Sequence, residues 1–302
     1  MVVQISANLR SKTLAGICLL VVATVLVAVQ DALTKELTSA LPVSQILAVR
    51  FAAMTVFAVA YLMVVTGAPR IRVALRSRAP VKQVLRCLLA CLEIALFTFA
   101  LRYLGLAEIH AIFACFPLIV TALSGPMLGE TVGWRRWCAV GFGFVGTLLV
   151  INPGSGVFEP AALLGLGCAL LYALYNLMTR QLSANDSFAT SMLYLALTGL
   201  LSSLVFAAFQ WQPIVSEDRW LLLGVCVTSV ASHLLLIKAL SLALAVVLQP
   251  FNYLILVWAS LIAFVVYGEL LNSVQLGGVT LVVVSGIYIA WREYVRSATR
   301  TS

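Results

Sequence analysis

A segment of the first half of the chain, Ala28-Val-Gln-Asp-Ala-Leu-Thr-Lys-Glu-Leu-Thr38, returns in the second half as Ala173-Leu-Tyr-Asn-Leu-Met-Thr-Arg-Gln-Leu-Ser183. The two segments align without a gap, and the alignment places Asp31 on Asn176. Weak internal symmetry of this kind is typical of a fold built from two copies of one unit.

A second pair of motifs extends the repeat. Ala100-Leu101 precedes Gly129-Glu130 by 29 residues, and Ala239-Leu240 precedes Gly268-Glu269 by the same distance. The offset between the halves is 145 residues at the first segment (173 − 28) and 139 at the second (239 − 100), so the first half carries six extra residues in a middle loop. We divide the chain into a first repeat, residues 1–152, and a second repeat, residues 153–302.

The composition predicts a protein embedded in lipid. Hydrophobic residues make up 63% of the chain and charged residues 10%, and the mean hydropathy is +1.08. A water-soluble domain carries about 25% charged residues, and a membrane-spanning helix needs about 20 mostly apolar residues. Ten such runs are present, at about residues 14–35, 43–66, 83–103, 106–128, 134–151, 160–179, 187–209, 220–239, 242–266 and 274–291.

The positive charges predict the orientation, because Lys and Arg accumulate on the cytoplasmic side of a membrane. With the N-terminus inside, fifteen of the eighteen Lys and Arg residues at loops or helix ends are cytoplasmic, against Lys35, Arg102 and Arg219 outside. Five helices per repeat is an odd number, so the second repeat enters the membrane inverted. We expect an all-α integral membrane protein of ten transmembrane helices, arranged as two inverted five-helix repeats with both termini cytoplasmic.

The same charge bias accounts for the net charge of +8, with added attraction to anionic membrane lipid. The basic residues lie on short loops without a recognition fold, which argues against a nucleic-acid partner. The seven cysteines lie in apolar runs and form no Cys-x-x-Cys pair, so we expect no metal site. The chain has no Gly-x-x-x-x-Gly-Lys-Ser/Thr loop for ATP, and we expect no cofactor.

The segment Ala100-Leu-Arg-Tyr-Leu-Gly-Leu-Ala107, leading through Pro117 to Gly129-Glu130, resembles the third-to-fourth helix segment of the EamA family in the drug/metabolite transporter superfamily. Its counterpart runs from Ala239-Leu240 to Gly268-Glu269. Within the family, the chain is most similar to amino-acid exporters of the YddG type.

This resemblance covers about residues 14–291. It implies a basket of helices one to four and six to nine around a central cavity, with helices five and ten outside it. It also implies a secondary transporter of a bacterial-type inner membrane that exports small amino acids, aromatic ones included, or related metabolites by alternating access. A homodimer is left open.

Three charged residues within the spans are the sharpest candidates for a substrate site. A charge at the depth of Glu93 costs about 3 kcal/mol on insertion scales, so this side chain either lines the cavity or is a neutral carboxyl bonded to a neighbouring helix. Arg50 keeps its charge and either binds a substrate carboxylate or pairs with Asp31 or Glu93. Asp31 either binds a substrate amine, is a helix-end residue reached by water, or pairs with Lys35 one turn further on.

Polar residues that share the expected depth complete the candidate set. His110 and Gln249 are counterparts near the starts of helices four and nine, and His233 adjoins Ser232, the counterpart of Glu93. A histidine at such a position is either a binding group or a satisfied helix contact.

Three further candidates come from local patterns. Tyr172 and Asn176 lie one helical turn apart, so they present an aromatic ring and an amide to the same side. Asn252 follows Pro250, where the proline frees backbone groups.

The rival functions are weaker. A sugar-phosphate, nucleotide-sugar or drug transporter of the same superfamily remains an alternative, but a phosphate site calls for clustered Lys and Arg, and Arg50 is the deeply placed cation. An intramembrane enzyme built on Ser229, Ser232 and His233 lacks a Gly-x-Ser-x-Gly motif. We therefore expect no enzyme activity.

Overall fold

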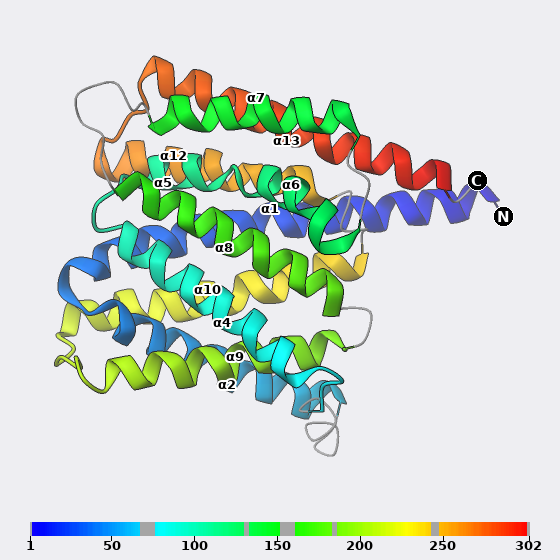
Figure 1. Cartoon of the computed structure of the whole chain (residues 1–302). Coiled ribbons are helices and arrows are strands. Elements are labelled where there is room, and N and C mark those ends of the chain that lie inside the picture. Colours follow the sequence, from blue (N-terminus) through cyan, green and yellow to red (C-terminus); the bar gives the residue numbers. More distant parts are fainter. Residues whose placement is uncertain are drawn as a thin grey trace.

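All elements of the computed structural model are helices within the residues that it describes, which are 2–66, 76–129, 133–151, 161–182, 186–242 and 248–300 (Figure 1). Lipid offers no hydrogen-bond partner to the backbone, so each apolar run pairs its N–H and C=O groups internally as a helix. In chain order these are α1 (Val2–Ala40), α2 (Val43–Thr66), α4 (Pro80–Ala100), α5 (Leu106–Phe113), α6 (Phe116–Leu128), α7 (Trp134–Ile151), α8 (Ala161–Leu182), α9 (Phe188–Ala207), α10 (Ser216–Leu242), the 3-10 helix η1 (Gln249–Tyr253), α12 (Leu254–Tyr267) and α13 (Ser273–Arg300).

The helices follow the expected apolar runs. Within the described residues, eight segments are long and apolar enough to cross a membrane, and α5 and α6 together form one of them, Leu106–Leu128. Two shorter apolar segments, Phe251–Tyr267 and Ser273–Ile289, overlap the expected ninth and tenth runs, and the ninth begins later than expected because Leu242 still belongs to α10. The chain is a multi-pass membrane protein.

The helices of the two halves of the chain break and end at matching places. A proline lies at the start of α6 and of η1, where its missing N–H interrupts helical hydrogen bonding. Gly129 ends α6 and Gly268 ends α12, both with positive φ, 69° and 66° respectively. Glycine adopts this left-handed conformation without the steric cost that other residues meet.

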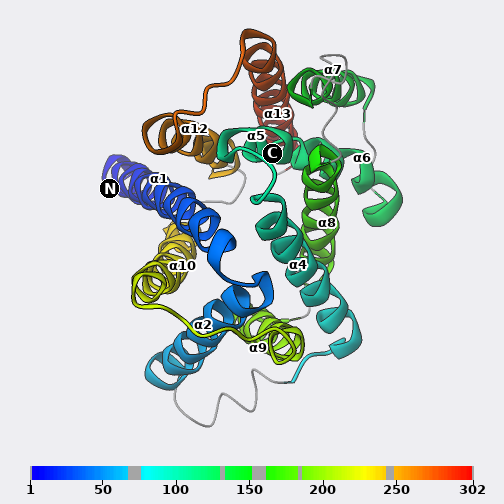
Figure 2. The same cartoon turned by 90° about the vertical axis from the view of Figure 1, so that its left-hand side faces the viewer.

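Both chain termini lie at one end of the bundle, which we call the terminal end; the opposite end is the far end (Figure 1). Viewed from the far end, α1, α10, α2, α9, α4 and α8 follow one another around the bundle, with α5, α6 and α12 next to α8 and α1 (Figure 2). The most extensive helix pairs are α1 with α10, α7 with α13, α2 with α9, and α4 with α8.

The pair α7 and α13 stands at the edge of the bundle, outside this ring (Figure 2). Its backbones approach closely at Gly146 and Gly278, since a Cβ atom added to Gly278 would lie 2.5 Å from the carbonyl oxygen of Gly146. Small residues at such crossings allow helices in lipid to pack through their backbones.

Candidate functional site

A contact between an imidazole and a carboxylate joins α1 to α5 inside the bundle. Nε2 of His110 lies 3.2 Å from Oδ2 of Asp31, and both residues are buried. The ring of Phe97 on α4 packs edge-on against the imidazole, with 5.3 Å between the ring centroids. The contact holds the imidazole beside the Asp31 carboxylate, so three helices of the first repeat meet at this pair.

Arg50 of α2 reaches α10 across the interior. Its Nε donates a hydrogen bond of 3.2 Å to Oγ of Ser229, and its guanidinium interacts electrostatically with Asp31 and Glu93. The Nη groups make no hydrogen bond or ion pair with any residue that the structure describes. A guanidinium has five N–H donors, so most of its binding capacity is left for another partner.

Glu93 of α4 is 7% exposed. Within the described part of the chain its carboxylate makes no hydrogen bond or ion pair, although it interacts electrostatically with Arg50 and Tyr172. A buried carboxylate without a partner is costly, and intramembrane acids of this kind mark substrate or proton sites. The expected alternative, a carboxyl bonded to a neighbouring helix, has no support among these contacts.

His233 of α10 belongs to the same region. Its Nδ1 lies 3.0 Å from the carbonyl oxygen of Ser229, the residue whose hydroxyl accepts from Arg50. Ser232 also hydrogen bonds to that carbonyl. One turn of α10 therefore carries both the histidine and the anchor of the arginine.

An aromatic group lies beside these charges. The ring of Tyr172 on α8 stands 4.8 Å from that of Phe116 and 5.2 Å from that of Phe113, centroid to centroid. Tyr175 continues the row at 5.8 Å from Tyr172. The side-chain amide of Asn176 donates a hydrogen bond to the carbonyl oxygen of Tyr172 in the same helix.

The remaining sequence candidates are less informative. Asn252 is half-buried in η1. Gln249 begins η1, and its side chain lies outside the residues whose side chains are described.

We call Asp31, Arg50, Glu93, His110 and His233 the central polar cluster.

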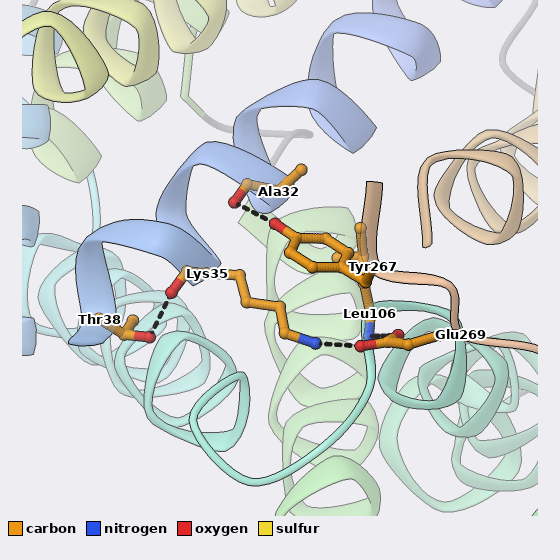
Figure 3. A network of polar contacts seen from close by, with 6 residues as sticks. All are labelled: Ala32, Lys35, Thr38, Leu106, Tyr267 and Glu269. Carbon is orange, nitrogen blue, oxygen red and sulfur yellow. Dashed lines mark hydrogen bonds and ion pairs between the residues drawn. The ribbon is translucent and has the colours of Figure 1, made fainter. Parts of the chain in front are cut away.

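The alternative pairing of Asp31 with Lys35 is wrong. Lys35 instead forms an ion pair of 2.5 Å with Oε1 of Glu269, while Oε2 of Glu269 accepts a hydrogen bond of 2.8 Å from the backbone N–H of Leu106 (Figure 3). Glu269 thereby binds an N–H group that the first turn of α5 leaves unpaired, and it ties α12 to α1 at the far end. In the sequence, only the Gly-Glu motif pointed to Glu269. The sequence did not indicate which residues Glu269 contacts.

Two further contacts join α1 to α12 beside this ion pair. The hydroxyl of Tyr267 donates to the carbonyl oxygen of Ala32 at 3.1 Å, and Nζ of Lys35 stands 4.7 Å from the Tyr267 ring centroid (Figure 3). A Cβ atom at Gly105 would lie 2.8 Å from Oε2 of Glu269, so a larger residue there would displace the carboxylate from this position.

A large cavity opens in the far half of the bundle between α1, α2, α4 and α9. Its volume is about 1590 Å³, larger than the ~300–1,000 Å³ of a closed small-molecule pocket, which is the size expected of a vestibule. Its inner end includes Leu47 and Phe51 of α2 and Cys91 of α4. They are near neighbours in sequence of Arg50 and Glu93, but no residue of the central polar cluster lines the cavity.

The terminal end is closed by a polar contact that sequence reasoning missed. The carboxylate of Asp186, between α8 and α9, accepts hydrogen bonds from Oγ of Ser77 at 2.5 Å, the backbone N–H of Arg78 at 3.0 Å and Nε2 of Gln83 at 2.7 Å. Desolvation by itself raises the pKa of Asp186. The hydrogen bonds outweigh this effect, so the pKa of Asp186 lies below its usual value. The bonds connect the start of α4 to the segment between α8 and α9.

Arg86 strengthens that closure one turn further into α4. It is 2% exposed and donates to Oγ1 of Thr179 at 3.2 Å and to the carbonyl oxygen of Ser191 at 2.9 Å. Its guanidinium also lies over the ring of Tyr175, 5.3 Å from the centroid. The side chain is therefore structural, and it links α4 to both α8 and α9.

No group of three or more His, Cys, Asp or Glu residues suited to a metal ion occurs among the described residues. A site made of one arginine, two carboxylates, two histidines and an aromatic wall suits recognition of a polar organic molecule.

Comparison with known proteins identifies transporters of small organic molecules as similar to this chain. A riboflavin transporter of Vibrio cholerae serotype O1 is 33% identical over 229 residues, covering 75% of this chain and 77% of that protein. An S-adenosylmethionine uptake transporter of Rickettsia prowazekii is 23% identical, covering 92% and 93%. A pseudopaline exporter of Pseudomonas aeruginosa is 25% identical, covering 91% and 95%.

A solved crystal structure shares the fold, with a TM-score of 0.62 and 18% identity over 94% of this chain and 98% of that one. The relatives are named for transport rather than for catalysis, and their substrates differ from one another. The profile of the EamA-like transporter family matches residues 14–152 and 159–291. The chain therefore belongs to the EamA-like transporter family of the drug/metabolite transporter superfamily, and its function is that of a membrane transporter of small metabolites.

Proposed function

We propose that this protein is a secondary transporter for a small organic metabolite that carries both a cationic and an anionic group, with amino acids as the first class to test. The observation that carries this proposal is the relation of Arg50 and Glu93. They lie on different helices and interact electrostatically, yet neither uses the other as an ion-pair partner. A guanidinium fits a carboxylate in a bidentate manner, and a carboxylate fits an amine.

A planar aromatic metabolite such as riboflavin is the second candidate. The row formed by Phe113, Phe116, Tyr172 and Tyr175 favours it, because aromatic faces stack on planar rings. The riboflavin transporter of Vibrio cholerae is also the relative with 33% identity. The two candidates differ in which residues they need, since an uncharged ring system has less use for Arg50 and Glu93.

We further propose that the ten helices form two inverted repeats with both termini cytoplasmic, in a bacterial inner membrane. The helix contacts support this arrangement. By the sequence offsets, α1 corresponds to α8, α4 to α10 and α6 to α12. The pair α1 and α10 therefore corresponds to the pair α8 and α4, and the pair α1 and α12 corresponds to α8 and α6. All four pairs are in contact. The pairs α2 with α9 and α7 with α13 map onto themselves.

In this orientation the cavity at the far end faces outward, and the Asp186 contact closes the cytoplasmic side. Alternating access then requires the far half of the cavity to close while a path opens at the terminal end. With export as the direction, the far cavity is the exit. Thiol labelling of cysteines placed after Glu217 and after Asn272 tests the orientation, and both positions should react from outside; cytoplasmic labelling at either would refute it.

Flux into liposomes tests the function. Purified protein should give saturable transport of at least one compound from a panel of amino acids, S-adenosylmethionine and riboflavin. Arg50→Gln and Glu93→Gln should each reduce transport of a zwitterionic substrate far more than transport of riboflavin. Riboflavin flux that responds only to Tyr172→Ala, together with no amino-acid flux, would replace the first candidate by the second.

A further inference from the structure

The cavity in the far half of the bundle has a wall made of side chains that face lipid. Leu88, Leu92 and Phe99 of α4 line it, and they are 44%, 55% and 38% exposed. Across from them, Phe206 of α9 lines the cavity and is 68% exposed. Large apolar side chains so exposed on membrane-spanning helices contact acyl chains, so the cavity opens sideways into the bilayer between α4 and α9.

The position on α4 supports this reading. Leu88, Leu92 and Phe99 share one face of the helix, because they are separated by four and seven residues. Val84 and Leu85 continue that exposed stripe toward the terminal end, at 40% and 50% exposure, without lining the cavity. The stripe is thus ordinary lipid-facing surface at one end and a cavity wall at the other.

The length of the wall matches one leaflet. Leu88 and Phe99 are eleven residues apart, which corresponds to about 17 Å along the helix at 1.5 Å per residue. One leaflet contributes about 15 Å to a hydrocarbon core of about 30 Å. The apolar wall therefore reaches from the membrane interface to about the midplane, as a single acyl chain does.

The interface end of the same cavity is polar and carries the cations Arg102 and Lys35 together with the acid Glu36, and Lys35 is already paired with Glu269. Arg102 and Tyr103 follow α4, and Gln210 and Gln212 follow α9; all four line the cavity. One Nη of Arg102 donates to the carbonyl oxygen of Leu41 at 3.0 Å, and the guanidinium has further donors for a phosphate. Apolar walls of one-leaflet length that end at an arginine are complementary to a phospholipid.

We propose that the cavity between α4 and α9 binds a phospholipid from the leaflet at the far end, with one acyl chain along Leu88, Leu92 and Phe99 and the phosphate at Arg102. The acyl chain supplies the missing side wall of the vestibule. The lipid is bound in addition to any transported substrate, and the proposal does not depend on which metabolite is carried.

Native mass spectrometry of delipidated protein, titrated with dioleoylphosphatidylglycerol, tests the site. The wild-type protein should retain one phospholipid. Ala95→Trp should lose it, because Ala95 lines the cavity between α4 and α9 and the indole would fill the space. The matched control Leu163→Trp places the same ring on a 55% exposed position of α8 outside the cavity lining, and it should retain the lipid.

Arg102→Gln should weaken binding of the anionic lipid about tenfold, the effect of removing one charge-assisted hydrogen bond. Should Ala95→Trp fail to fold, Ser202→Phe fills the cavity from α9 instead. Absence of a retained lipid in the wild type, or equal retention by the filled and control variants, would overturn the proposal. The measurement involves no transport, so failure of the proposed function would leave it unaffected.

Discussion

Substitution of Gly278 by alanine tests how α7 and α13 are held together. A Cβ atom there would stand 2.5 Å from the carbonyl oxygen of Gly146 and 2.9 Å from the backbone nitrogen of Val150. Both neighbours are backbone atoms of α7, which cannot rotate away as a side chain does. The helices must therefore separate by several tenths of an ångström, and the contacts along the crossing loosen.

The chain offers a matched control one residue away. A Cβ atom at Gly277 would meet nothing within 4 Å, so Gly277→Ala adds the same methyl group to the same helix without a clash. Alanine is favoured over glycine in a helix interior by about 1 kcal/mol. Gly277→Ala should thus be neutral or stabilising.

Gly278→Ala gains the same helical preference but forces an overpacked contact, which costs about 1–3 kcal/mol in a packed core and more where backbone must move. We expect it to be less stable than Gly277→Ala by about 2–3 kcal/mol, or roughly 5 °C in Tm. Thermal unfolding of both variants in the same detergent measures this difference. Equal Tm values for the two variants would refute the role assigned to the close backbone crossing.

Three other substitutions have defined outcomes. Glu269→Gln should lower the unfolding free energy by about 1–2 kcal/mol through loss of the ion pair and of a strong bond to α5; a double-mutant cycle with Lys35→Met should show coupling, and additive effects would contradict the pair. Asp186→Asn should lower stability near neutral pH but not once the pH has fallen below the folded pKa of Asp186, because a carboxylate whose folded pKa is depressed stabilises above its unfolded pKa of about 3.9 and loses that contribution as pH falls through the folded pKa; denaturant unfolding at several pH values checks this, and a constant difference between the two proteins would contradict it. Glu93→Gln should reduce transport in liposomes and flatten its dependence on pH while expression is kept, and an unchanged pH profile would assign Glu93 to packing.

The helices could be predicted from the sequence because their cause is local. Lipid forces each apolar run to satisfy its own backbone, so long apolar runs read directly as helices. The breaks before α6 and η1 and the ends at Gly129 and Gly268 were also encoded locally, by proline and by glycine. The repeat further indicated which elements correspond.

The polar contacts depended on partners far away in the chain. Lys35 had an acid one turn away in Asp31, yet it pairs with Glu269, 234 residues later. The carboxylate of Asp186 takes partners from 103 to 109 residues earlier. Periodicity says which face of a helix a residue occupies, but the choice among several candidate partners is set by how the helices cross.

The two halves of the chain share their helix arrangement but differ in the polar residues that these helices carry. The ionisable residues of the central polar cluster in the first half have counterparts in the second half that do not ionise, so the two halves supply one scaffold but not the same chemistry. The counterparts of Asp31, Arg50, Glu93 and His110 are, by the same offsets, Asn176, Leu195, Ser232 and Gln249.

The contact that closes the terminal end shows the same division. The counterparts of Gln83, Arg86, Asp186 and Ser191 are Leu222, Val225, Leu41 and Ile46, which pack as one apolar cluster at the far end. Equivalent helix contacts are thus polar at one end and apolar at the other. An apolar contact in lipid loses little on separation, whereas each buried hydrogen bond left unmade costs about 1–3 kcal/mol. Separation of the helices at the terminal end therefore costs more free energy than separation of the equivalent apolar contact at the far end.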